Sequence, residues 1–158
     1  MSVTTDIVGS WRHPRRVIRR HLDRQKSEPF AFSLLVVFLV LVFIAQWPRL
    51  SRDAALPPEV PLLPALLATG LALLAAIPVL YGVAAVSHLA ARAVGGTGDY
   101  HGARLALFLA LLSASPLMLL QGLTVGFLGQ GAQALAVGVV ALIVFGAVWI
   151  SMLIEAET

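Results

Sequence analysis

The feature of this sequence that most constrains its fold is the complete lack of charged residues from Leu105 to Ile154. A membrane helix needs about 20 apolar residues, so this stretch is too long for one span and too short for three spans with turns. Two spans fit it, at about 103–121 and 132–153. The turn between them is expected to hold the glycines of this region, Gly122, Gly126, Gly129 and Gly131.

Two further apolar segments precede that stretch. Residues 30–47 reach about 27 Å as a helix, which is enough to cross the hydrocarbon core. Residues 62–86 are longer, and Pro78 is expected to bend them; a polar loop, 48–61, separates the two segments. Apolar residues make up 59% of the chain and charged residues 12%, against about 45–50% and 25% in soluble proteins. The sequence therefore predicts an all-α membrane protein with about four transmembrane helices, forming one membrane domain over 30–158.

The segment 1–29 is basic and amphipathic. On a helical wheel, the apolar side chains between Trp11 and Leu22 fall on one side and the arginines on the other. We expect a cytoplasmic interfacial helix with its apolar side in the lipid. The segment is not expected to be a cleaved signal peptide, because its charged region is far too long and no small-residue cleavage site follows the next apolar run. The alternative is a disordered basic tail. The residues expected to contact anionic lipids are Arg15, Arg16, Arg19 and Arg20.

The distribution of basic residues predicts the orientation of the chain in the membrane. Arg92 and Arg104 fall on the same side as the basic N-terminal segment, whereas the other side holds only Arg49 and Arg52. Because basic residues favour the cytoplasmic side, both termini are expected there. The same clustering before a span argues against nucleic-acid binding. The arginine-, alanine- and leucine-rich composition favours a bacterial protein of the inner membrane.

A glycine-rich turn between the second and third spans is the strongest candidate for a binding site. Its backbone N–H groups, ringed by basic side chains, could hold a lipid phosphate or the carboxylate of a partner. The alternative is a tight connection whose glycines supply positive φ angles. The predicted site residues are Arg92, Gly95, Gly96, Gly98, Tyr100, His101 and Arg104.

Small residues repeat every four positions on the second and third spans. This spacing lets helices approach closely, either inside the protein or at an interface with another membrane protein. The repeats consist of Ala68, Ala72 and Ala76 on the second span, and Ala106, Ala110 and Ala114 on the third.

The residue types that would carry chemistry are sparse. The chain has no cysteine, and His88 and His101 flank one loop rather than facing each other across helices, so no cofactor or metal site is expected. No ionisable residue lies near the middle of a span, which argues against ion or proton transport. Serines in the spans lack an acid or base partner, so the sequence predicts no enzyme activity.

Three motifs give the chain from Pro14 onward a resemblance to a known family. They are Pro14-Arg15-Arg16 before the first span, Gly95-Gly96-Thr97-Gly98-Asp99-Tyr100 in the turn, and Ser113-Ala114-Ser115-Pro116 in the third span. In these the chain resembles the YIP family of Ypt/Rab-GTPase-interacting membrane domains. The resemblance implies a small helical membrane protein with a cytoplasmic N-terminus and no enzymatic activity. Eukaryotic members are associated with Rab proteins, vesicle traffic and membrane shaping; they have five spans and a long acidic N-terminal region, which this chain lacks.

These patterns favour a YIP-like scaffold that organises the membrane or binds partners within it. The expected partners are the lipid bilayer, anionic lipids on the cytoplasmic face, and the protein itself or another membrane protein. One alternative is an accessory subunit of a respiratory or photosynthetic complex. Another is a small carrier or channel for a neutral or lipidic solute.

Overall fold

A computed structural model describes residues 3–23, 27–56 and 61–158, and all regular secondary structure in these ranges is α-helical. Four of the helices are long and apolar enough to cross a membrane, which confirms the predicted fold class. The helices are α1 (Val3–Arg12), α2 (Pro14–Leu22), α3 (Glu28–Ala55), α4 (Leu62–Ala93), α5 (Tyr100–Leu128) and α6 (Ala132–Glu157).

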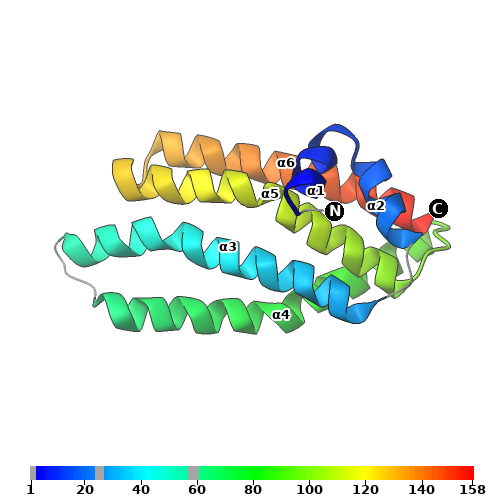
Figure 1. Ribbon diagram of the computed structural model, residues 1–158, viewed down its shortest axis with the longest axis horizontal. Coiled ribbons are helices and arrows are strands. Elements are labelled where there is room, and N and C mark those ends of the chain that lie inside the picture. Colours follow the sequence, from blue (N-terminus) through cyan, green and yellow to red (C-terminus); the bar gives the residue numbers. More distant parts are fainter. Residues whose placement is uncertain (1–2, 24–26, 57–60) are drawn as a thin grey trace.

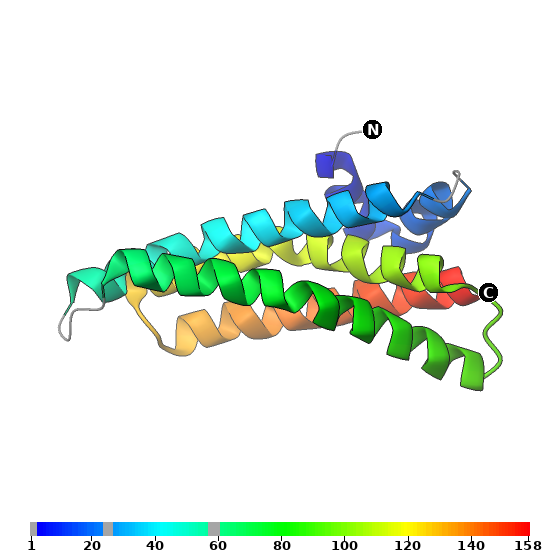
Figure 2. The ribbon, with the colours of Figure 1, turned by 90° about the horizontal axis from the view of Figure 1, so that it is seen from below.

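The four long helices run alternately up and down, so the start of α3 and the end of α6 lie at the same end of the bundle (Figure 1). The short helices α1 and α2 lie beside α5 and α6 towards that end. Helix α5 is central and contacts every other helix. Most of its central residues are buried, whereas none of the central residues of α4 is. Figure 2 shows the C-terminal part of α4 diverging from α3.

Helices α3 and α5 extend beyond the predicted spans 30–47 and 103–121, and the two helices cross in backbone contact. Helix α3 continues through Pro48, and Gly122 and Gly126 lie inside α5 rather than in the turn. A Cβ atom on Gly122 would lie 2.8 Å from the carbonyl carbon of Ala45, and one on Gly126 would lie 2.9 Å from that of Pro48. These glycines therefore allow the two helices to approach closely.

The polar residues after Pro48 stay helical and stabilise the far end of α5. Arg52, near the end of α3, donates from Nη1 to the carbonyl oxygens of Gly126 and Phe127 at 3.3 and 3.2 Å. These carbonyls lie in the last turn of α5, where no further backbone N–H is available. The turn that follows begins at Gly129, whose φ of 83° favours glycine.

The basic N-terminal segment is helical, and part of its apolar side packs against protein, whereas Trp11 on that side is 48% exposed. Val17 and Ile18 are buried in the common core, and α2 packs against α6. His21 lies 3.2 Å from Asp6, which joins α2 to α1, and Arg19 forms an ion pair with Glu155 of α6. A helical wheel shows that one face is apolar, but it does not show whether lipid or protein covers that face. Two further basic residues of this segment, Arg24 and Lys26, lie outside the described residues.

The Ser-Ala-Ser-Pro motif lies inside α5 without ending it. Pro116 has no N–H, so the carbonyl of Leu112 loses its helical donor. Ser115 replaces that donor with its own hydroxyl, Oγ to oxygen at 2.7 Å. One residue further, the carbonyl of Ser113 accepts a hydrogen bond of 2.8 Å from Trp11 Nε1. The motif therefore keeps α5 continuous and attaches the N-terminal helix α1 to it.

Candidate binding site at the ends of α4 and α6

Three backbone N–H groups of the glycine turn between α4 and α5, those of Gly95, Gly96 and Thr97, donate within the chain. Gly95, with a φ of 99°, donates to the carbonyl of Arg92, and Gly96 donates to that of Ala91 at 2.9 Å. This pair of bonds is the Schellman arrangement that ends many helices. The Thr97 amide donates to the backbone carbonyl of Glu157 at 2.7 Å. These three amides are therefore not directed at an external phosphate or at the carboxylate of a partner, and the positive φ of Gly95 fits the alternative of a tight connection.

The group that lies in the turn is the carboxylate of the chain's own Glu157. Its side chain is 5% exposed, and Oε1 lies 2.7 Å from Nδ1 of the equally buried His88 on α4. The His88 ring contacts the Tyr100 ring, with centroids 4.3 Å apart. A Cβ atom on Gly96 or Gly98 would lie 3.1 or 2.9 Å from Glu157 Oε2, so these glycines make room for the carboxylate.

The other carboxylate oxygen of Glu157, Oε2, is buried and has no hydrogen-bond partner among the described residues. An unpartnered buried acceptor of this kind is costly and rare in native proteins. Sequence reasoning missed this group, because Glu157 and His88 are far apart in the chain and each resembles an ordinary residue at a helix end.

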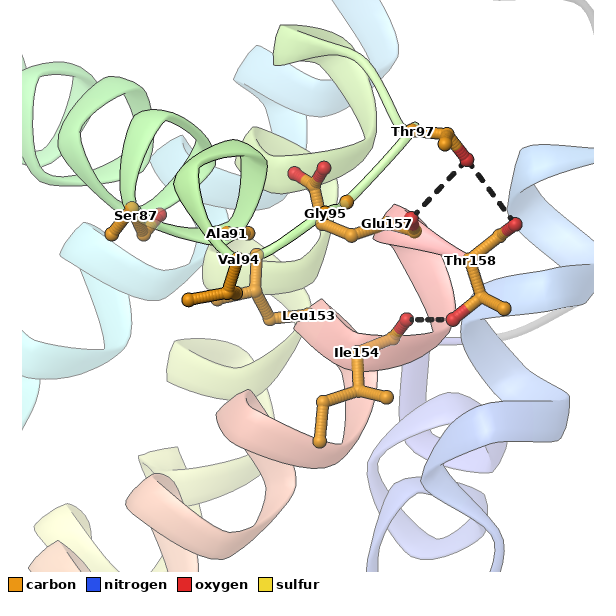
Figure 3. A pocket seen from close by; sticks show the side chains of 11 residues that line it. Ser87, Ala91, Val94, Gly95, Thr97, Leu153, Ile154, Glu157 and Thr158 are labelled. Atoms are coloured by element: carbon orange, nitrogen blue, oxygen red, sulfur yellow. Dashed lines mark hydrogen bonds between the residues drawn. The ribbon is translucent and has the colours of Figure 1, made fainter.

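Next to this carboxylate lies an open cleft of about 620 Å³ between the ends of α4 and α6 (Figure 3). Figure 3 shows the Glu157 side chain extending from α6 towards the glycine turn and the end of α4. Residues of the glycine turn, including Thr97, form one side of the cleft. The main apolar residues that line the cleft are Ala90, Ala91, Val94, Leu153 and Ile154.

Two other predicted residues, His101 and Arg104, contact a second carboxylate, that of Glu28 at the start of α3. Arg104 contacts it from Nη2 to Oε1 at 2.8 Å and from Nη1 to Oε2 at 3.0 Å. His101 Nδ1 also lies 3.0 Å from Oε1. The Arg104 guanidinium lies 5.7 Å from the centre of the Tyr81 ring, so this cluster joins α3, α4 and α5. Arg92 is exposed on the last turn of α4 and belongs to neither carboxylate cluster.

The other predicted residues fall into two groups. Arg15, Arg16, Arg19 and Arg20 are all exposed on α2, and Arg19 forms the ion pair with Glu155. Of the alanine repeats, the one on α5 is buried, with Ala106, Ala110 and Ala114 at most 3% exposed. On α4, Ala68 and Ala72 are exposed and Ala76 is half-buried.

No group of three or more histidine, aspartate or glutamate side chains in the described part of the chain could hold a metal ion. The charged clusters lie at the ends of the long helices, and the middle of the bundle is apolar. These features define a multi-pass helical membrane protein.

The family model of the Yip1 domain matches residues 8–156, nearly the whole chain. The chain therefore belongs to the Yip1 domain family, which confirms the resemblance to the YIP family. This family is one of non-enzymatic membrane proteins. Comparison with curated proteins and with solved structures gave no match.

Proposed function

We propose that this Yip1 domain protein is a non-catalytic scaffold of the bacterial inner membrane that binds other transmembrane helices through α4. The observation that carries the proposal is the unequal packing of the four long helices. Helices α3, α5 and α6 form a packed unit, whereas α4 has no buried residue in its central region. A helix this weakly covered by its own chain offers most of its surface to lipid or to a partner.

The uncovered surface of α4 includes the residues suited to close helix contact. Its inner face packs against the bundle through Leu73, Ile77 and Leu80. Ala68 and Ala72 lie on a different, exposed face. Because lipid tails are as apolar as the helices, association in the membrane depends on close van der Waals packing, which small residues permit. The proposed partner is a transmembrane helix of a second copy or of another membrane protein.

The exposed arginines of α2 support a cytoplasmic position for this end of the bundle. Arg15, Arg16 and Arg20 have exposed side chains, and each basic residue near an anionic leaflet contributes about 1 kcal/mol of attraction. With an even number of spans, the C-terminal end of α6 lies on the same side as α2 (Figure 1). We propose that this end faces the cytoplasm and its anionic lipids.

Cysteine cross-linking tests the scaffold proposal, because the chain has no cysteine of its own. Ala68→Cys and Ala72→Cys each introduce a single thiol on the proposed contact face. A short bifunctional maleimide, applied to native membranes, should give a discrete adduct whose mass distinguishes a second copy from another protein. Leu74→Cys is the matched control, because Leu74 is 61% exposed and lies on another face of the same helix. No adduct at positions 68 and 72, or an equal yield at position 74, would contradict the proposal.

A further inference from the structure

Three of the five glutamines of the chain line one pocket at the end of the bundle opposite the glycine turn. Gln46 lies on α3, Gln121 on α5, and Gln130 in the turn between α5 and α6. None of their three amide groups makes a hydrogen bond to another described residue. A side-chain amide carries two N–H donors and an acceptor oxygen. This glutamine pocket therefore offers donors and acceptors that the described part of the chain leaves to water or to a ligand.

The glutamine pocket has a mouth and an inner wall. Its volume is about 210 Å³, which equals about seven water molecules at their volume in the liquid. Arg49 and Gln130 line it with exposed side chains. Val42 and Ala45 line it from within the bundle, where they are 8% and 5% exposed. The pocket therefore extends from the surface towards the crossing of α3 and α5, and it has room for one small polar group.

Helix α6 holds one of the glutamines at the wall of the pocket. A Cβ atom on Gly138 of α6 would lie 2.6 Å from Nε2 of Gln121 and 3.7 Å from its Oε1. The absence of a side chain at position 138 therefore leaves the space in which the Gln121 amide lies. Gln121 itself is half-buried, so three helices fix the position of this polar wall.

The pocket lies where two candidate membrane spans, α3 and α5, approach their ends. Trp47, next to Gln46 on α3, is 48% exposed, and an exposed tryptophan near the end of a span is typical of the interface between lipid and water. A ligand at this depth is the headgroup of a lipid or a small solute that enters from the water.

The hydrogen-bonding groups of the pocket select the chemistry of the ligand. Arg49 is its one charged lining residue, and Arg49 Nε lies 3.6 Å from Oδ2 of Asp53, which balances the charge at the mouth. A phosphate oxygen only accepts hydrogen bonds, and an ammonium group only donates them. Either ion would satisfy only part of an amide. A hydroxyl group both donates and accepts, and therefore matches a wall of amides.

We propose that the glutamine pocket binds a polyhydroxylated group, which is the glycerol or sugar headgroup of a lipid or a free polyol. Its hydroxyls donate to the Oε1 atoms and accept from the Nε2 atoms of the glutamines, and Arg49 donates to an oxygen at the mouth. The proposal depends on the membrane position of α3 and α5. It does not depend on the scaffold function of α4, because none of the described residues that line this pocket belongs to α4.

Native mass spectrometry of the full-length protein, in a detergent without a sugar headgroup, tests the proposal. Phosphatidylglycerol and phosphatidylpropanol with identical chains share the phosphate and differ in the two hydroxyls of the headgroup. Phosphatidylglycerol should bind about tenfold more tightly, because two further hydrogen bonds form. An excess of free methyl glucoside should displace it if the ligand is a soluble polyol, and should leave it bound if the ligand is a headgroup. Equal binding of the two lipids, without binding of the glucoside, would overturn the proposal.

Substitutions locate the binding in the glutamine pocket. Gln46→Leu and Gln121→Leu each remove one amide while keeping a side chain of similar size. Either change should bring the binding of phosphatidylglycerol close to that of phosphatidylpropanol. Gln133→Leu is the matched control, because Gln133 is an exposed glutamine of α6 that is not among the lining residues. An unchanged preference in folded Gln46→Leu and Gln121→Leu variants, or an equal loss in Gln133→Leu, would overturn the proposal.

Discussion

The crossing of α3 and α5 at Gly122 predicts that alanine destabilises the protein at this position but not at Gly146, a glycine of α6 with open space around it. A Cβ atom on Gly122 would lie 2.8 Å from the carbonyl carbon of Ala45 and 3.2 Å from its Cα. Carbon atoms attract each other best at about 3.5–4.0 Å, so these contacts are repulsive. Both atoms belong to the backbone of α3, and therefore no change of rotamer relieves the contact. Gly122→Ala should force the two helices apart.

The magnitude follows from two opposing contributions. Overpacking a close contact costs about 1–3 kcal/mol. Replacing glycine by alanine inside a helix returns up to about 1 kcal/mol. The net effect of Gly122→Ala is a loss of up to about 2 kcal/mol, which lowers the thermal midpoint by up to several degrees in a chain of this size.

The assay is reversible unfolding of the purified protein in detergent, followed by circular dichroism. Gly146→Ala is the matched control, because a Cβ atom on this α6 glycine would meet nothing within 4 Å. The control should be as stable as the parent protein or more stable, whereas Gly122→Ala should be less stable. If Gly122→Ala proved at least as stable as the parent, α3 and α5 would not be in backbone contact at this crossing.

Three further predictions concern the links between helices. Glu28→Gln should lower stability by about 0.5–1 kcal/mol, because its partly exposed ion pair with Arg104 is screened by solvent; a double-mutant cycle with Arg104→Gln should show coupling, and purely additive losses would contradict the pairing. Trp11→Phe should cost about 1 kcal/mol by removing its hydrogen bond to α5, and should make the N-terminal segment more sensitive to protease; unchanged cleavage would refute this. Ser115→Ala should cost about 1–3 kcal/mol, measured as a lower unfolding midpoint, because it leaves a buried carbonyl of α5 without a donor. An unchanged midpoint would show that this carbonyl has another donor.

Hydrophobicity and charge predicted the number and type of the long helices, because an uncharged stretch of this length has few other solutions in a membrane. The ends of the helices were harder to predict. Pro48 and Gly122 are signals for a helix end when only local sequence is considered. Here both lie inside helices, because each is placed at the crossing where α3 and α5 make close contact.

The candidate site was predicted only in part. The glycine turn was found, because its glycines and basic residues are adjacent in the sequence. The carboxylate that the turn encloses was not predicted, because it belongs to Glu157 at the end of α6. The partner of this carboxylate, His88, lies on α4. Pairings between distant segments depend on the packing of the helices, and one sequence carries no local signal for them. The same reason explains why Arg104 binds Glu28 instead of an external anion.

In the proposed arrangement, four helices cross the membrane and leave α2, the glycine turn and the end of α6 on the cytoplasmic side. Single cysteines test it directly, because the chain contains none. Arg16→Cys and Val94→Cys place exposed thiols on the proposed cytoplasmic side, and Leu56→Cys and Gln130→Cys place them on the other. In intact bacterial cells, a membrane-impermeant maleimide should label positions 56 and 130, and should label positions 16 and 94 only after permeabilisation. Labelling of position 16 or 94 in intact cells would contradict this arrangement.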